Sequence, residues 1–430
     1  MGFNTSPFFS LSAAIASVLV VFTLPVSSSS QCPNRPGGRL QSSEWPKTCP
    51  VPGQLGIVED PDYPTAVSWD FAPRCMVGEQ KENATIPRIH CLFTAADFRN
   101  GHGISLVAST TVTSHLLGLG ALEDRPDPLA AQKRAARGPA YDIVDVPGKG
   151  KGVVANRRIR RGEIIIVDFP AVLIGTHFLT DAAPHHRRRI LKQAIKQLPE
   201  RTRERVNGLT KREGEYEVDS ILGQNSNSVV LGDGEIHVGL FTEAARINHS
   251  CRPNAYFRFS EERLTMEVGA YRQIETGEEI VMSYVPVTAK HTDRRNYLKE
   301  NWGFDCKCSL CLASELDVSD SEGRRRRMTE LKESVLHARR EGFFQDAINM
   351  AGEWLMFSEW ESLPPLESEF HDTLSELYLL NGDMVNATRH GRMALDEWVK
   401  LGSVDDDQLE RSRLFLRGLS LPAAQPKVGK

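Results

Sequence analysis

The apolar and polar positions of the chain take on a regular pattern near Tyr141, and this pattern predicts a domain built from short strands. Residues 141–146 alternate as a half-buried strand does, and a glycine-rich turn then leads into a second strand that ends at Ala155. Further short strands are predicted over 164–167, 255–259 and 264–270, and before Tyr284. Between them, residues 181–215 have a helical composition and many basic side chains, which we interpret as inserted helices with a solvated face.

The C-terminal part of the chain has a helical period instead. Met350, Trp354 and Phe357 fall on one face of a helix, and Gly382 ends a later helix. We predict a helical domain over residues 325–419 that resembles tetratricopeptide-like hairpins. At most two such units are visible, so this domain has to pack on another part of the chain to be stable.

The first residues form an apolar and uncharged segment. Residues 1–34 carry no charged side chain, and residues 11–24 are a continuous run of apolar and small residues followed by Pro25. A secretory signal peptide has this layout, and the run is too short for a typical transmembrane helix. We therefore predict a signal peptide over residues 1–30 and no membrane span in the mature chain. The predicted location is the secretory pathway or the extracellular space, with a nuclear or cytoplasmic protein as the alternative.

Residues 31–138 are rich in proline and glycine, and their periodicity is weak. They include a glycosylation sequon at Asn83. They also include an even number of cysteines: Cys32, Cys49, Cys75 and Cys91. In an oxidising compartment these cysteines would pair in one of three connectivities, and an extension with free thiols is the alternative. Nothing in this Cys/Pro/Gly-rich region identifies a chemistry.

Composition limits the classes of function. The chain has 430 residues, of which 25% are charged and 40% hydrophobic, and its formal net charge at pH 7 is −4. These values are typical of a soluble globular protein with two or three domains. Because the net charge is negative, we expect no direct binding of nucleic acid.

Residues 246–254 concentrate the candidate chemistry. Asn248 to Cys251 place an amide, an imidazole, a hydroxyl and a thiol on consecutive residues, Pro253 favours a turn or an extended conformation, and Asn254 adds a second amide. A purely structural turn has little use for so many directional groups beside a thiol that can bind a metal. The simpler alternative is a polar turn around a buried histidine.

Two further motifs stand on either side of this stretch. The earlier one is a turn with glycines at alternate positions 148, 150 and 152, which lets the backbone approach a ligand closely. It is not a phosphate-binding loop, because it lacks a Gly-Lys-Ser/Thr ending and no helix pattern follows. The later motif runs from Gly277 to Tyr284 as a turn and a strand that end at a tyrosine. A Cys-x-Cys-x-x-Cys pattern then supplies Cys306, Cys308 and Cys311.

The order and spacing of these blocks resemble a SET domain of the protein lysine methyltransferases with its cysteine-rich post-SET tail. The similarity covers residues 139–312 and is closest to the SMYD-type subgroup, which continues into a helical C-terminal domain. The resemblance implies an α+β fold, in which the SET domain is a β-clip of short sheets. The subgroup's MYND zinc finger is missing, because residues 156–250 contain no cysteine.

The resemblance also implies an activity, namely methyl transfer from S-adenosylmethionine to a lysine side chain of a histone or another protein substrate. Tyr284 corresponds to the family's catalytic tyrosine. Phe257 and Met282 are candidate walls of the lysine channel. The positions implied to bind the cofactor are Lys149, Gly150, Lys151, Gly152, Asn248, His249, Tyr284 and Phe304.

A structural zinc ion is implied as well. Closed zinc sites take four ligands, and the family uses the cysteine of the Asn-His-Ser-Cys signature as the fourth. The implied ligands are Cys251, Cys306, Cys308 and Cys311. A disulfide is the alternative in an oxidising compartment, although Cys-x-Cys is a poor spacing for one.

Two interpretations of the function therefore stand side by side. The first is an active protein lysine methyltransferase, which Asn248, His249 and Tyr284 favour. The second is a non-catalytic secreted or lumenal interaction protein built on an inactive SET scaffold, which the signal-like N-terminus favours because it points away from the cytosolic cofactor pool. A structural zinc protein without catalysis is a third possibility.

Overall fold

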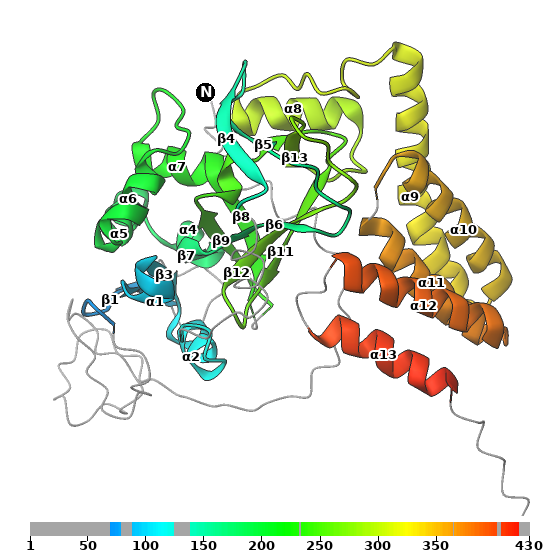
Figure 1. Ribbon diagram of the computed structural model, residues 1–430. Helices are drawn as coiled ribbons and strands as arrows, with labels where there is room; N and C mark the ends of the chain where they lie inside the picture. The colour runs from blue at the N-terminus through cyan, green and yellow to red at the C-terminus, as the bar shows by residue number, and fades with distance from the viewer. Residues whose placement is uncertain are drawn as a thin grey trace, which may run out of the picture. The chain divides into compact units, whose positions relative to one another are not determined.

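The computed structural model describes residues 69–78, 88–123, 138–231, 234–363, 365–401 and 406–420 (Figure 1). Two compact units divide the chain. The first is drawn from Met1–Ala131, Asp168–Ala245 and Glu261–Met266. The second is drawn from Gln132–Val167, Arg246–Ser260 and Glu267–Lys430. The predicted signal peptide, Cys32, Cys49 and Asn83 lie outside the described residues.

A six-stranded sheet forms the centre of the first unit. Its strands, in spatial order, are β1 (Arg74–Val77), β2 (Ile89–Ala95), β3 (Ile104–Ala108), β7 (Pro170–Gly175), β9 (Ile236–Phe241) and β8 (Ser226–Val230). β3 and β7 pair in parallel, whereas the other neighbours are antiparallel. Strands β2 and β3 come from the region in which the sequence showed weak periodicity. Almost every residue of both strands is buried, so their apolar positions run continuously and do not alternate.

Helices accompany this sheet. They are α1 (Phe98–Gly101), α2 (Thr110–Gly118), α4 (Thr176–Asp181), α5 (Pro184–Gln197), α6 (Glu200–Asn207) and α7 (Glu217–Asn225). Two of them, α5 and α6, confirm the inserted helical segment predicted from the composition of residues 181–215. The apolar side chains Leu191 and Ala194 of α5 belong to the same buried core as Val172 and Ile174 of β7. Arg189, Lys192 and Lys196 of α5 are exposed, which agrees with a solvated face, whereas Arg187 and Arg188 are half-buried.

One of the cysteine pairs expected from the sequence is present in the first unit. Cys75 of β1 and Cys91 of β2 are directly opposite in the antiparallel register and form a disulfide. This bridge joins the edge strand β1 to the rest of the sheet.

Two small sheets lie in the second unit. The four-stranded sheet has the order β10 (Asn248–His249), β13 (Glu279–Met282), β5 (Gly150–Ala155) and β4 (Tyr141–Val146). The three-stranded sheet, most of which belongs to this unit, has the order β11 (Ala255–Ser260), β12 (Thr265–Ala270) and β6 (Ile164–Asp168). The hairpin of β4 and β5 confirms the pattern seen near Tyr141, and short sheets together with helices confirm the predicted α+β class.

Helices make up the rest of the second unit. They are α8 (His291–Trp302), α9 (Glu315–Arg340), α10 (Phe344–Trp360), α11 (Pro365–Leu380), α12 (Met384–Leu401) and α13 (Asp406–Ser420). Figure 1 shows α9 to α12 side by side as two successive hairpins. Trp354 of α10 and Phe370 of α11 share a buried core with Met328 of α9, so the aromatic face expected from the period is indeed core.

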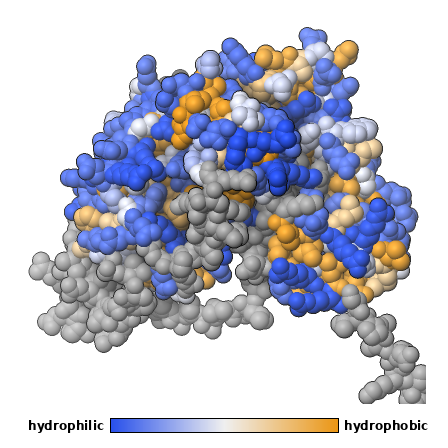
Figure 2. Space-filling model, viewed as in Figure 1, coloured by the Kyte–Doolittle hydropathy of each residue, from blue (hydrophilic) through white to orange (hydrophobic). Residues whose placement is uncertain are grey.

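The helical segment begins earlier than the predicted position 325. The hydroxyl of Ser314 accepts the backbone N–H of Asp317 and caps α9, whose first turns are charged and therefore carry no apolar period. None of the helices in the described ranges combines the length and the apolarity that crossing a membrane requires. Figure 2 shows a mostly hydrophilic face with hydrophobic side chains gathered over the C-terminal helices, where Val385 and Val399 are exposed.

Candidate functional site

The candidate site forms where β10 lies beside β13 in the second unit. These strands pair in parallel, with Asn248 opposite Val281 and His249 opposite Met282. β13 pairs with β5 on its other edge, and Tyr284 follows β13. The sheet therefore brings together the glycine turn, the Asn-His-Ser-Cys stretch and the tyrosine, which are far apart in the sequence.

The glycines of the turn serve two different purposes. Gly148 and Gly150 have φ angles of 74° and 76°, in the left-handed region that glycine adopts without strain. Gly152 is required for space, since a Cβ there would lie 2.8 Å from Nδ2 of Asn248 and 2.5 Å from Cγ2 of Val146. The missing side chain at position 152 thus allows Asn248 to approach the strand closely.

Asn248 is held by an acidic residue that the sequence analysis did not single out. Its Nδ2 donates to Oε1 of Glu279 at 2.9 Å and to the carbonyl of Lys151 at 3.3 Å. The other carboxylate oxygen of Glu279 pairs with Nζ of Lys149 at 2.6 Å. Glu279 therefore connects two of the positions implied to bind the cofactor, Asn248 and Lys149. In the sequence, the feature that could have pointed to Glu279 was its position inside the Gly277–Tyr284 block.

His249 links the tyrosine to the first cysteine. It is 5% exposed, and its Nδ1 accepts the backbone N–H of Tyr284 at 3.0 Å. Its Nε2 lies 3.4 Å from Sγ of Cys251. The alternative of a buried histidine in a polar turn is therefore right about burial, but both ring nitrogens contact residues that the motifs had picked out.

The hydroxyl of Tyr284 points at the backbone beside the same strand. It donates to the carbonyl of Ile247 at 2.7 Å. Burial, together with the negative charge of Glu279, raises the pKa of this hydroxyl above its ordinary value of about 10. The side chain is consequently a neutral phenol at physiological pH and does not act as a base.

Aromatic rings cover this part of the site. The ring centroid of Phe304 lies 6.2 Å from that of His249, and the ring of Trp302 lies 5.1 Å from that of Tyr284. Phe304 is thus beside His249, as its implied role requires. Trp302 was not predicted, because in the sequence it is an ordinary aromatic at the end of a helix.

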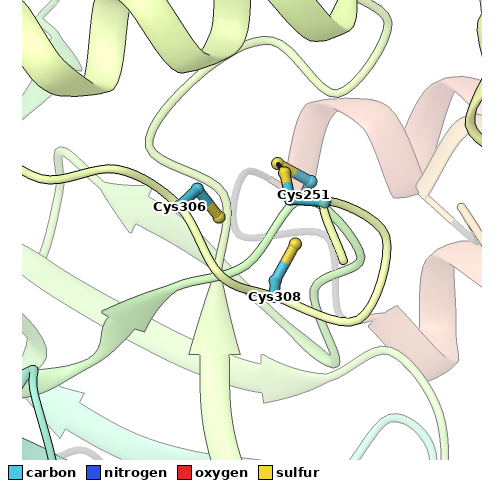
Figure 3. A group of neighbouring side chains, drawn as sticks. Cys251, Cys306 and Cys308 are labelled. Carbon is cyan, nitrogen blue, oxygen red and sulfur yellow. Dashed lines mark hydrogen bonds between the residues drawn. The ribbon is translucent and has the colours of Figure 1, made fainter. Parts of the chain in front are cut away.

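Four cysteines converge next to these rings. The Sγ atoms of Cys251, Cys306, Cys308 and Cys311 all lie within 4.8 Å of one another. Figure 3 shows the side chains of Cys251, Cys306 and Cys308 turned toward a common point. All four are free thiols, so the disulfide alternative does not apply to them.

The donor set fits a zinc ion. A tetrahedral site with Zn–S bonds of about 2.3 Å places its sulfur atoms about 3.8 Å apart, and the Sγ atoms of Cys251 and Cys311 are separated by 3.6 Å. Hydrogen bonds among the four side chains lower the pKa of Cys306 and Cys308 and raise the pKa of Cys251 and Cys311, which reflects how closely the sulfur atoms approach one another. The four cysteines are therefore a group that could bind zinc.

The two candidate channel walls differ in exposure. Met282 is 5% exposed and lies opposite His249, whereas Phe257 on β11 is 39% exposed. Phe257 thus points toward solvent over a large part of its surface, and its role in a channel stays a prediction.

Asn254, the second amide of the central stretch, has a structural role. It is 1% exposed, its Oδ1 accepts the N–H of Val281 at 2.8 Å, and its Nδ2 donates to the carbonyl of Glu279 at 2.9 Å. The amide therefore satisfies backbone groups of β13 where no further strand continues the sheet.

Comparison with known proteins agrees with this geometry. Residues 150–285 match the family described as SET domain, and the chain therefore contains a SET domain. This range runs from Gly150 to the residue after Tyr284, so it includes Asn248, His249 and Tyr284 but not Lys149, Phe304 or the three post-SET cysteines.

The similar proteins are SET5 and SMYD-type lysine methyltransferases, which confirms the predicted resemblance. Histone-lysine N-methyltransferase set5 of Schizosaccharomyces pombe is 29% identical over 187 residues, which cover 44% of this chain and 55% of that protein. Histone-lysine N-methyltransferase SMYD3 of Homo sapiens is 32% identical over 101 residues, covering 24% and 23%. Protein-lysine N-trimethyltransferase SMYD5 of Mus musculus is 34% identical over 108 residues, covering 24% and 26%. The chain thus spans about half of the first relative and about a quarter of the other two.

The role of Gly152 can be tested through stability. We expect Gly152→Ala to lower the free energy of unfolding by about 1–3 kcal/mol, because the new methyl group overpacks the site against Val146 and Asn248. Adding Val146→Ala should restore part of the loss, since it removes the methyl group of closest approach. Chemical denaturation of the single and double variants is the measurement.

Gly323→Ala provides the matched control, because a Cβ at this position of α9 has nothing within 4 Å. The control should be neutral or stabilising. A Gly152→Ala protein as stable as the wild type would contradict the steric argument.

Proposed function

We propose that this protein is a protein-lysine N-methyltransferase that uses S-adenosylmethionine. The observation that carries the proposal is the parallel pairing of β10 with β13, which sets Asn248 and His249 beside the buried hydroxyl of Tyr284. The names of the similar proteins, all of them lysine methyltransferases, support the same class of reaction.

Residues of the second unit would hold the cofactor. The backbone at Gly150 is exposed and a Cβ there would have nothing within 4 Å, so a ligand could approach it closely, whereas the space beside Gly152 is taken by Asn248. The network of Asn248 and Glu279 fixes one polar edge, and the ring of Phe304 supplies an apolar cover beside His249. When bound, S-adenosylmethionine supplies a methyl group on a positively charged sulfur.

Tyr284 acts in this proposal by positioning. A free lysine amine has a pKa of about 10.4 and must lose its proton before it can attack. The tyrosine does not remove that proton, since burial keeps its own hydroxyl neutral. Apolar walls such as Met282 would instead lower the pKa of the entering amine, and the hydroxyl would hold that amine at near-attack distance.

The role of Tyr284 in turnover can be tested separately from cofactor binding. Tyr284→Phe removes the hydroxyl alone, so we expect cofactor affinity to stay near the wild-type value while turnover falls by at least about 100-fold. Calorimetry with S-adenosylmethionine and a methyl-transfer assay on mixed protein substrates are the two measurements. Tyr297→Phe, which alters another tyrosine packed against the same cluster, is the matched control and should keep its turnover. A well-folded wild-type protein that binds no cofactor would exclude the enzymatic proposal.

We further propose that the four cysteines bind one zinc ion, which fastens the post-SET tail to the loop bearing Asn248 and His249. At such a site the free energy of metal binding contributes to folding. Zinc would then influence cofactor affinity as well, because Phe304 lies on the same tail.

The zinc site is tested by two cysteine variants. Cys251→Ser should lose zinc and cofactor binding together, because one thiolate is removed and the tail loosens. Cys75→Ser breaks the disulfide of the first unit and costs stability, of the order of 2–5 kcal/mol, but should keep zinc and cofactor. Elemental analysis and cofactor titration of both variants measure whether zinc and cofactor are kept. Full zinc content in Cys251→Ser would place the fourth ligand elsewhere.

The location of the protein is a separate proposal. A signal peptide over residues 1–30 is supported by the apolar, uncharged N-terminal sequence, and the disulfide between Cys75 and Cys91 is typical of an oxidising compartment. The same disulfide favours the second candidate function, a non-catalytic interaction protein in the secretory pathway. Cofactor binding to purified protein distinguishes the two functions.

Mass spectrometry of the protein from its native host tests the location. We expect removal of about the first 30 residues and a glycan on Asn83, since both follow from entry into the secretory pathway. An intact N-terminus with unmodified Asn83 would favour the nuclear or cytoplasmic alternative.

A further inference from the structure

A buried arginine in α9 contacts the loops of the candidate site. Arg325 is 1% exposed, and each nitrogen of its guanidinium has a partner. Nη2 donates to the carbonyl of Cys251 at 3.2 Å, and Nη1 donates to the carbonyl of Val287. Nε donates to Oε2 of Glu361 at 2.9 Å. One side chain thus joins the loop of the first cysteine, the segment after Tyr284 and the end of α10.

The charge of this arginine is balanced inside the helical domain. Glu361 is fully buried at the C-terminal end of α10. Its carboxylate also accepts the hydroxyl of Ser321 at 2.6 Å and Nε of Arg324 at 2.7 Å. The ion pair and its hydrogen bonds therefore hold the guanidinium in a fixed orientation from which it can reach the two loop carbonyls.

A second buried arginine acts on the same segment. Arg294 of α8 donates to the carbonyl of Ala289 and pairs with Glu322 of α9 at 3.3 Å. The side chain of Val287 itself packs against the helical core that contains Met328. The segment after Tyr284 is consequently fixed by two guanidinium groups and one apolar contact, all toward α8 and α9.

We propose that Arg325 is a positioning residue through which the helical C-terminal domain holds the Cys251 loop and the segment after Tyr284 in their functional geometry. Because the peptide carbonyls of Cys251 and Val287 receive donors from one rigid group, their separation is set by α9. The consequence for cofactor affinity rests on the proposed methyltransferase function, whereas the consequence for the two loops does not.

The buried pair of Arg325 and Glu361 specifies the position of the two loops more than it adds stability. Buried ion pairs contribute little net free energy compared with apolar substitutes, so this pair is not explained as a stabilising element. A planar guanidinium can donate in several fixed directions at once, whereas an apolar side chain of similar volume would fill the space without fixing either carbonyl. The arrangement therefore specifies loop position.

The experiment uses the full chain and a paired substitution. Arg325→Met alone would leave the Glu361 carboxylate buried without its main partner, so the test variant is Arg325→Met with Glu361→Gln, which removes both charges and keeps the volumes. The matched control is Arg327→Met with Glu353→Gln. This second pair also joins α9 to α10, with Nε and Oε1 3.0 Å apart, but its side chains are 44% and 34% exposed instead of buried.

Hydrogen exchange is the first measurement, since it requires neither metal nor cofactor. Peptides covering residues 247–256 and 283–292 should exchange at least about tenfold faster in the test variant, and within twofold of the wild type in the control. Zinc release to a chelator should accelerate in parallel, and the dissociation constant for S-adenosylmethionine should rise about tenfold. If the hydrogen exchange of both peptides and the release of zinc in the test variant stay within twofold of their rates in the control variant, the proposal is overturned.

A second variant covers the case in which the test protein does not fold. Arg325→Lys keeps the charge next to Glu361, but its compact ammonium lacks the planar fork with which three separate guanidinium nitrogens reach Glu361 and the two carbonyls, so the same two peptides should exchange faster. Unchanged exchange in folded Arg325→Lys would likewise overturn the proposal. If the wild-type protein binds no cofactor, the methyltransferase proposal fails, and the exchange result still decides the role of Arg325.

Discussion

The central constraint of the second unit is that the short strand β13 must be hydrogen-bonded along both edges. β5 occupies one edge, and the other is shared by the two residues of β10 and by the side-chain amide of Asn254. An unpaired buried N–H or C=O on β13 would be costly, so both partners are held firmly in register. Asn248 and His249 thereby stand beside the strand that leads to Tyr284. The arrangement of the candidate site is therefore a result of satisfying the backbone hydrogen bonds of one four-residue strand.

The sequence predicted those parts of the structure whose pattern is local. The hairpin near Tyr141 appears as β4 and β5, although β4 is exposed or half-buried along its whole length and does not bury alternate residues as expected. The cysteine cluster was also foreseen, although through a family signature rather than through spacing. Gly152 stood inside a recognised turn, but only the structure showed that its missing side chain makes room for Asn248.

Other parts could not be predicted for identifiable physical reasons. Strands β2 and β3 are buried on both faces and so lack alternation. Arg325 stands in a run of four arginines at the charged beginning of α9, where an exposed side chain is the natural expectation. Its burial depends on Glu361 and on two loop carbonyls that are distant in the sequence. Trp302 likewise gains its significance only from the ring of Tyr284 next to it.

The contacts of His249 have a consequence for the position of a single proton. Since Nδ1 accepts the N–H of Tyr284, the neutral imidazole must carry its hydrogen on Nε2, which faces the sulfur of Cys251. This tautomer directs the Nε2–H at the sulfur of Cys251, so the two hydrogen bonds together fix the orientation of the ring between the tyrosine peptide and the cysteine. Replacing that one sulfur by a group that cannot accept a hydrogen bond would leave the Nε2–H of a buried imidazole without a partner, so a change at the cysteine cluster would be felt one hydrogen bond away from the tyrosine, without any change in the sheet that carries it.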